Sequence, residues 1–110
     1  MRKQLSMIQV ACQERGHIHS ILPAEPVHVL LEDQNEHWLL TISKKGIDFS
    51  DKKVQPWQLK ISAKEGQIAH CLAGEQRLFL YHRMGKIDML GLYRLQLWFE
   101  SLLWLCRAYK

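Results

Sequence analysis

The chain has 110 residues, of which 47% are hydrophobic and 24% are charged, and its formal net charge at pH 7 is +4. This length fits one domain over residues 1–110, and this composition excludes a disordered chain, which has too few apolar residues to form a core. The basic residues occur as short pairs such as Lys44-Lys45 and Lys52-Lys53. Nucleic-acid binding needs a denser basic stripe or a recognisable module, so we expect no nucleic-acid partner.

The three cysteines, Cys12, Cys71 and Cys106, form an odd and widely spaced set. Such a set makes neither a disulfide framework nor a zinc site, and it is typical of a reducing compartment. The first residues lack the apolar core of a signal peptide, and no stretch approaches the roughly 20 apolar residues of a membrane span. The sequence predicts a cytoplasmic protein that makes at most transient contact with a membrane.

The first half of the chain predicts one helix and then three strands. Apolar residues recur at helical spacing over residues 4–15, and Gly16 stands where a C-terminal cap is expected. Two prolines follow, so residues 17–26 are expected to form a connection. Short turn sequences join the three strands, which predicts an antiparallel meander over residues 27–32, 37–43 and 47–50.

The third quarter of the chain predicts a strand followed by a short helix. Apolar and polar residues alternate over residues 57–62, from Trp57 onward, which is typical of a half-buried strand. Ser62 and Glu65 match a capping box at the start of the helix, which should end at Gly74. Residues 77–84 fit either a strand or a single helical turn.

The last quarter predicts a strand at residues 86–90, a bend at Gly91 and a closing helix over residues 92–110. The predicted order is therefore α-β-β-β-β-α-β-α. Strands in series followed by strands that alternate with helices indicate an α+β fold. We expect a five-stranded sheet, built from the meander and the two later strands, with helices on one face.

The closing helix has more apolar surface than one core requires. At about 100° per residue, a single stripe accounts for one side, and it comprises Leu95, Trp98, Phe99, Leu102, Leu105, Cys106 and Tyr109. The opposite side should be polar, yet Tyr93, Leu97 and Trp104 line up there. This second stripe should meet a ligand, a partner chain, a membrane surface or more of the protein's own core.

Two stretches resemble the sterol carrier protein 2 domain family. The hairpin over residues 38–47 (Trp-Leu-Leu-Thr-Ile-Ser-Lys-Lys-Gly-Ile) is similar to the family's Trp-strand-turn-Gly-strand sequence. The tail is similar as well, with an alternating strand, a short helix ending Leu-Ala-Gly, the sequence Gly-Lys-Ile-Asp-Met-Leu-Gly and an amphipathic helix. The family usually has Asp or Asn after that last glycine, where this chain has Leu92. The resemblance implies a small α+β fold whose sheet and helices enclose an apolar cavity.

The resemblance also implies a non-catalytic function, the binding or transfer of a fatty acyl, sterol-like or prenyl lipid. No cofactor is expected. The residues expected to line the cavity are Phe79, Met84, Met89, Trp98, Phe99, Leu102 and Leu103. The alternative is an interaction or dimerisation module with a collapsed cavity. In that case the second stripe, Tyr93, Leu97 and Trp104, forms the interface with a second copy or another protein.

The sequence offers no catalytic or metal-binding motif. His17 and His19 would share a face in an extended segment, but a metal site needs three or four converging ligands. Neighbouring residues on a helix point about 100° apart, so His70 and Cys71 would not form a base–nucleophile pair. We predict no enzyme activity, no catalytic residue and no metal site, and we expect Cys71 to be a small core residue.

Overall fold

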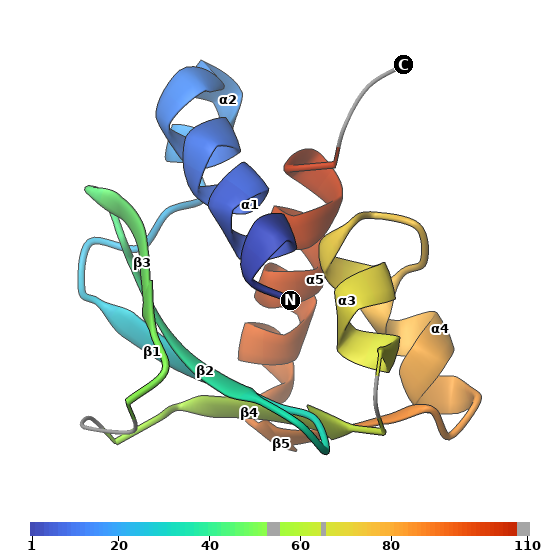
Figure 1. The fold of residues 1–110 in the computed structure, drawn as a ribbon. Coiled ribbons are helices and arrows are strands. Elements are labelled where there is room, and N and C mark those ends of the chain that lie inside the picture. The colour runs from blue at the N-terminus through green and yellow to red at the C-terminus, as the bar shows by residue number, and fades with distance from the viewer. Residues whose placement is uncertain (53–55, 65, 108–110) are drawn as a thin grey trace.

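A computed structural model of the chain describes residues 1–52, 56–64 and 66–107 (Figure 1). Helices and strands follow one another in the predicted order, with two additional short helices, and the α+β fold class is confirmed. The elements are α1 (Arg2–Glu14), α2 (Gly16–His19), β1 (Val27–Glu32), β2 (His37–Ser43), β3 (Gly46–Ser50), β4 (Leu59–Ala63), α3 (Gln67–Leu72), α4 (Leu78–Arg83), β5 (Ile87–Gly91) and α5 (Tyr93–Leu105).

The five strands form one sheet in the order β3-β2-β1-β4-β5. β1, β2 and β3 make the predicted antiparallel meander. β4 pairs in parallel with β1 and antiparallel with β5, so the sheet is mixed. The helices gather on one face of this curved sheet, as the sequence predicts, and α1 lies across α5 in Figure 1.

The core fills the space between the sheet and the helices. Its largest completely buried side chain is Phe99 of α5, and Leu5 of α1 and Leu40 of β2 are also completely buried. No polar or charged residue in the described part of the chain is buried. The described ranges contain no helix with both the length and the apolar composition needed to cross a membrane.

Three local predictions are wrong near the first helix and the fourth strand. Gly16 does not cap α1, because Arg15 leaves the helix in an extended conformation and Gly16 starts α2 within the predicted connection. Ser62 lies inside β4 and caps nothing, since α3 begins after Gly66, whose φ is +83°. Glu65, the other half of the predicted box, lies outside the described residues. β4 begins only at Leu59, which leaves Trp57 before the strand and 39% exposed.

The ambiguous segment at residues 77–84 is helical and forms α4. No side chain close in sequence caps its start. Instead, the Glu100 carboxylate of α5 accepts a hydrogen bond from the backbone N–H of Phe79 at 2.9 Å. Arg77 in turn lies 3.5 Å from the other oxygen of Glu100. The helical state of α4 therefore depends on a residue that is distant in sequence.

The final helix begins after Leu92, which supplies no side-chain cap, and it ends at Leu105. The chain enters this helix through Gly91, whose φ of +140° suits glycine. A Cβ atom at Gly91 would lie 2.6 Å from the carbonyl oxygen of Gln58, so the close approach of β5 to β4 also requires glycine. Tyr109, predicted on the apolar stripe, lies outside the described residues.

Candidate functional site

An open groove of about 510 Å³ runs along α1 beside the end of α5. This volume is within the range of roughly 300–1,000 Å³ that is typical of small-molecule sites. The groove is lined by both apolar and polar residues. The apolar ones are Met7, Val10, Ala11 and Cys106, and the polar or charged ones are Lys3, Ser6, Glu14 and Arg15.

The spacing of residues on α1 explains why a groove forms there. Leu5, Ile8 and Cys12 occupy the buried stripe of this helix. Met7 and Val10 lie on a neighbouring stripe, where they are 53% and 48% exposed. α1 thus presents apolar surface in two directions, and only one of them meets the core.

Two thiols lie beneath the groove. The Sγ atoms of Cys12 in α1 and Cys106 at the end of α5 are 3.7 Å apart, and both residues are buried. Their hydrogen bond lowers the pKa of Cys12, against the opposing effect of burial. The same bond raises the pKa of Cys106, and burial raises it further. The pair therefore loses its first proton more readily than its second, and the remaining proton is shared between the two sulfur atoms.

Arg15 lines the groove where α1 ends. Its Nη1 donates hydrogen bonds of 2.7 Å to the carbonyl oxygens of both Leu105 and Arg107. Carbonyl groups at a helix C-terminus lack partners within the helix and carry partial negative charge, so a guanidinium is well placed there. This contact fixes the end of α1 against the end of α5.

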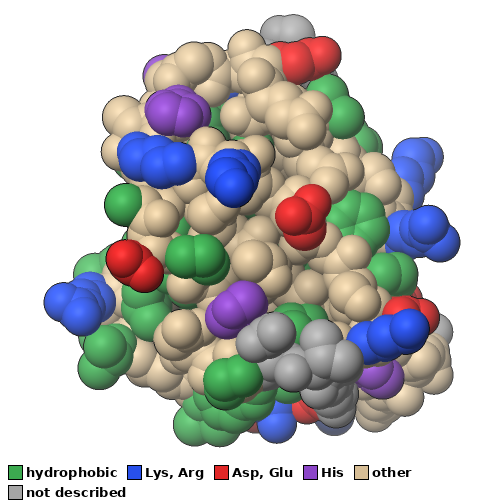
Figure 2. Space-filling view, turned by 90° about the vertical axis from the view of Figure 1, so that its left-hand side faces the viewer, with side chains coloured by type: hydrophobic (Ala, Val, Ile, Leu, Met, Phe, Trp, Pro, Cys, Tyr) green, Lys and Arg blue, Asp and Glu red, His purple; other side chains and the backbone are tan. Residues whose placement is uncertain are grey.

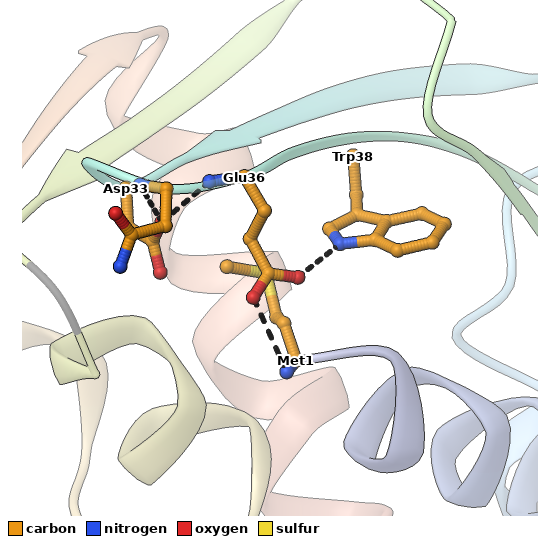
Figure 3. Close-up of polar contacts among 5 residues, drawn as sticks. Met1, Asp33, Glu36 and Trp38 are labelled. Carbon is orange, nitrogen blue, oxygen red and sulfur yellow. Dashed lines mark hydrogen bonds and ion pairs between the residues drawn. The ribbon is translucent and has the colours of Figure 1, made fainter.

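The start of α1 is fixed as well (Figure 3). The Met1 amino group lies 3.7 Å from the Glu36 carboxylate, which also accepts a 2.5 Å hydrogen bond from the Trp38 indole. Asp33 shapes this turn, because its Oδ1 accepts hydrogen bonds from the backbone N–H groups of Asn35 and Glu36. The wall of the groove is therefore held at both ends, by the β1–β2 turn and by α5.

No family model matches the sequence, and no curated protein matches it. Solved structures match its fold. The UbiJ-SCP2 ubiquinone synthesis protein superposes with a TM-score of 0.70 at 15% identity, over 92% of this chain and 85% of that one. The palmitated SCP2L2 protein of Aedes aegypti superposes with a TM-score of 0.68 at 10% identity, over 94% and 93% of the two chains. This chain has the sterol carrier protein 2 fold.

The same fold also matches part of a larger protein. The sec-alkylsulfatase Pisa1 of Pseudomonas superposes with a TM-score of 0.65 at 8% identity, over 84% of this chain but only 14% of that one. The SCP-2-like unit therefore occurs both alone and within a much longer chain. At these identities the likeness concerns the fold.

The seven residues expected to line a cavity do not line the groove. Met89, Phe99, Leu102 and Leu103 belong to the buried core of the SCP-2-like fold, and Phe79 and Trp98 are partly buried against it. Met84 lies at the end of α4, where it is 54% exposed. Cys106, which lines the groove, follows Leu102 and Leu103 by about one helical turn.

The second stripe of α5 is divided between two environments. Trp104 is half-buried, and its ring lies 4.9 Å from the Arg77 guanidinium and 4.2 Å from that of Arg107. Tyr93 contacts the Phe79 ring edge-on at 5.6 Å but is 65% exposed. Leu97 is 41% exposed. Trp104 thus meets the rest of the chain, while Tyr93 and Leu97 remain at the surface.

Four exposed apolar residues lie close together in sequence at the junction of β5 and α5. This corner patch consists of Leu90, Leu92, Tyr93 and Leu97, which are 58%, 59%, 65% and 41% exposed. Figure 2 shows hydrophobic side chains gathered at the bottom of the molecule, the end at which β4 and β5 lie in Figure 1. A group of exposed apolar side chains on one part of the surface commonly marks an interaction site. Helical spacing separates Tyr93 and Leu97 from the main apolar stripe of α5, whereas Leu90 and Leu92 precede the helix and carry no such signal.

The histidines and cysteines do not converge on a metal site in the described ranges, where no three His, Cys, Asp or Glu residues come together. His17 and His19 are exposed on α2. Cys71 is a core residue, as predicted. Burial raises the pKa of the Cys71 thiol to about 12, and the negative charge of Glu100 contributes to the same effect.

Proposed function

We propose that this SCP-2-like protein binds a hydrophobic small molecule and transfers it without catalysing a reaction. The ligand class is a fatty acyl, sterol-like or prenyl lipid. The observation that supports this proposal best is the groove beside α1, which combines a suitable volume with apolar side chains that the core leaves uncovered. The names of two proteins with the same fold, a palmitated SCP2L2 and a ubiquinone synthesis protein, support the same ligand class.

The proposed site uses the groove as the first contact for an apolar chain. Covering Met7 and Val10 would remove apolar surface from water, at about 25 cal/mol per Å². A methionine suits such a wall, since its flexible thioether repacks around ligands of different shape. Lys3 also lines the groove and has no hydrogen bond or ion pair to the described part of the chain, so it is available to an acidic head group.

The predicted lining residues remain the proposed deeper part of the site. Leu102 and Leu103 precede Cys106 by about one turn, so a ligand that parted α1 from α5 would reach them from the groove. The proposed location is the cytoplasm, where reducing conditions keep cysteines as the free thiols found here. Nucleic acid is not a proposed partner.

Two experiments test this function. Native mass spectrometry of protein purified from its natural host should reveal a bound lipid, and a fluorescent fatty-acid probe should bind to the delipidated protein. In Met7→Glu, a charge enters the apolar wall, so the probe should bind at least about tenfold more weakly, a change of about 1.4 kcal/mol. A protein that carries no lipid and ignores every probe would contradict the proposal.

Two variants of α4 serve as comparisons for Met7→Glu. Met84 is 54% exposed, almost the same as the 53% of Met7, but belongs only to the lining predicted from sequence. Leu80, 41% exposed on the same helix, belongs to neither site. Probe affinity should stay within twofold in Leu80→Glu. A large loss in Met84→Glu with none in Met7→Glu would move the ligand from the groove to the interior beside α4.

The corner patch supports a second function, an interaction module that uses the start of α5. Leu90, Leu92, Tyr93 and Leu97 form an apolar surface that no described element covers. In this alternative, a second copy of the chain or another protein covers the patch. The two functions involve different ends of the molecule, so they can be tested separately.

A further inference from the structure

We infer that Cys12 and Cys106 are an oxidation site, at which a peroxide converts the two thiols into a disulfide that ties α1 to the end of α5. This inference goes beyond the proposed lipid binding, because it requires no ligand. It concerns the floor of the same groove, to which Cys106 contributes. Cys71 lies elsewhere in the core and takes no part.

The geometry of the pair favours a disulfide. The two Sγ atoms are 3.7 Å apart, and a disulfide bond of about 2.05 Å requires them to approach further. Both cysteines lie at helix ends, where such a shift is easiest. Cys12 is in the last turn of α1, and Cys106 is the C-terminal cap of α5. A side-chain adjustment there does not have to break the interior of either helix.

The surroundings of the pair favour reaction with a small oxidant. Cys106 lines the open groove, so a molecule the size of hydrogen peroxide can approach the pair from that side. The hydrogen bond between the thiols favours a Cys12 thiolate, which is the nucleophilic form. The positive charge of the Arg15 guanidinium lowers the pKa of Cys106 against the stronger opposing effects, which helps Cys106 to lose its proton when it attacks in the second step.

The chemical step balances with one peroxide. The Cys12 thiolate attacks one oxygen of hydrogen peroxide, the O–O bond breaks, and the products are a Cys12 sulfenic acid and a hydroxide that takes up a proton to become water. The Cys106 sulfur then loses its proton and attacks the Cys12 sulfur, which expels a second hydroxide as water. The two thiols lose two electrons in total, and the peroxide gains them.

The disulfide would change how the two ends of the chain hold together. Residues 12 and 106 are 94 positions apart, and a cross-link over a loop of this length restricts the unfolded chain strongly. It would also prevent α1 from separating from α5 at the floor of the groove. The oxidised protein should therefore unfold at a higher temperature than the reduced protein.

The test is the mass of the intact chain after peroxide treatment. Reduced protein is exposed to a small excess of hydrogen peroxide, the peroxide is removed, and the remaining thiols are alkylated in denaturant, because Cys71 is buried in the folded protein. We expect the loss of two hydrogens, one alkylated cysteine, Cys71, and a digest in which the peptides of Cys12 and Cys106 are linked. Three alkylated cysteines, a sulfinic acid in place of the link, or a disulfide that includes Cys71 would overturn the inference.

Variants and a reversal control complete the test. Cys71→Ala should still form the link, while Cys12→Ala and Cys106→Ala should lose it. Using both single variants keeps the test informative if one of them folds poorly, which circular dichroism detects.

The midpoint of thermal unfolding should rise on oxidation and return after treatment with a thiol reductant. An unchanged midpoint would contradict the link between the helices. Fatty-acid probe binding by the reduced protein tests the proposed function independently.

Discussion

The two halves of α5 are both rich in apolar residues, but they lie in different surroundings. In the second half, Phe99, Leu102 and Leu103 are buried in the core. In the first half, Tyr93 and Leu97 remain exposed and no residue is buried. The second half lies beside α1, which reaches it through Cys12 and Arg15. The first half leaves β5 at the edge of the sheet, so the neighbours of each half, and not its composition, determine its burial.

The largest expected difference between the halves is in stability. Phe99 is completely buried, so Phe99→Ala leaves a cavity and should lower the free energy of unfolding by about 3–5 kcal/mol. Tyr93→Ala is the matched change in the first half and should cost less than about 1 kcal/mol, because that ring is 65% exposed. Urea unfolding monitored by circular dichroism measures both. Equal losses would mean that the two halves are packed alike.

Gly91, through which the chain enters the exposed half of α5, should nevertheless tolerate no side chain. Gly91→Ala adds a Cβ atom 2.6 Å from the carbonyl oxygen of Gln58, and it forces alanine to a φ of +140°. We expect a loss of stability of about 3 kcal/mol, at the upper end of typical backbone strain. Gly46→Ala is the matched control, since its φ is +113° but nothing lies within 4 Å of the added atom. It should cost about 1 kcal/mol, and a Gly91→Ala loss no larger than this would exclude the clash.

The buried half should depend on its cap from α1. Arg15→Met keeps an unbranched side chain but removes the two hydrogen bonds to the carbonyls of Leu105 and Arg107. Hydrogen bonds from a charged donor contribute about 1.5–3 kcal/mol, and we expect a loss in the lower part of that range because Arg15 is only partly buried.

Arg94→Met is the control for the cap. Arg94 is exposed in the first half of α5 and makes no ion pair with the described residues, so its removal should change stability by less than about 0.5 kcal/mol. Hydrogen exchange of the last amides of α5 gives a second readout. Those amides should exchange faster in Arg15→Met and normally in Arg94→Met. Unchanged exchange in both variants would show that the cap does not hold the end of the helix.

Local patterns were sufficient to predict most of the sheet. Val27–Glu32 and His37–Ser43 begin and end where alternation and turn residues predict, because burial of one face and a short turn are both local signals. The state of α4 could not be predicted in this way. Its first N–H groups are satisfied in part by Glu100, which lies 21 residues from Phe79. A segment that depends on a distant partner carries no complete local signal.

The groove could be predicted only in part. Met7 and Val10 lie off the buried stripe of α1, and two apolar residues on the outer side of a helix are a signal that was available in the sequence. The pairing of Cys12 with Cys106 was not available, since it arises only when the two end helices lie side by side. For the same reason the stripe of Tyr93, Leu97 and Trp104 was predicted as one surface, although Arg77 and Arg107 enclose only Trp104.

The smallest expected effect on stability concerns the corner patch, where the outcome for assembly is most informative. Leu97 is 41% exposed, so Leu97→Glu should change the free energy of unfolding by less than about 0.5 kcal/mol. If a second copy covers the patch, the charge should lower the sedimentation coefficient of the native protein over a range of concentrations. Leu102→Glu is the contrasting variant, because Leu102 is completely buried and a carboxylate there should unfold the domain. If Leu97→Glu unfolds the protein, the first half of α5 is part of the core. If the sedimentation coefficient is unchanged, the patch is not a dimer interface.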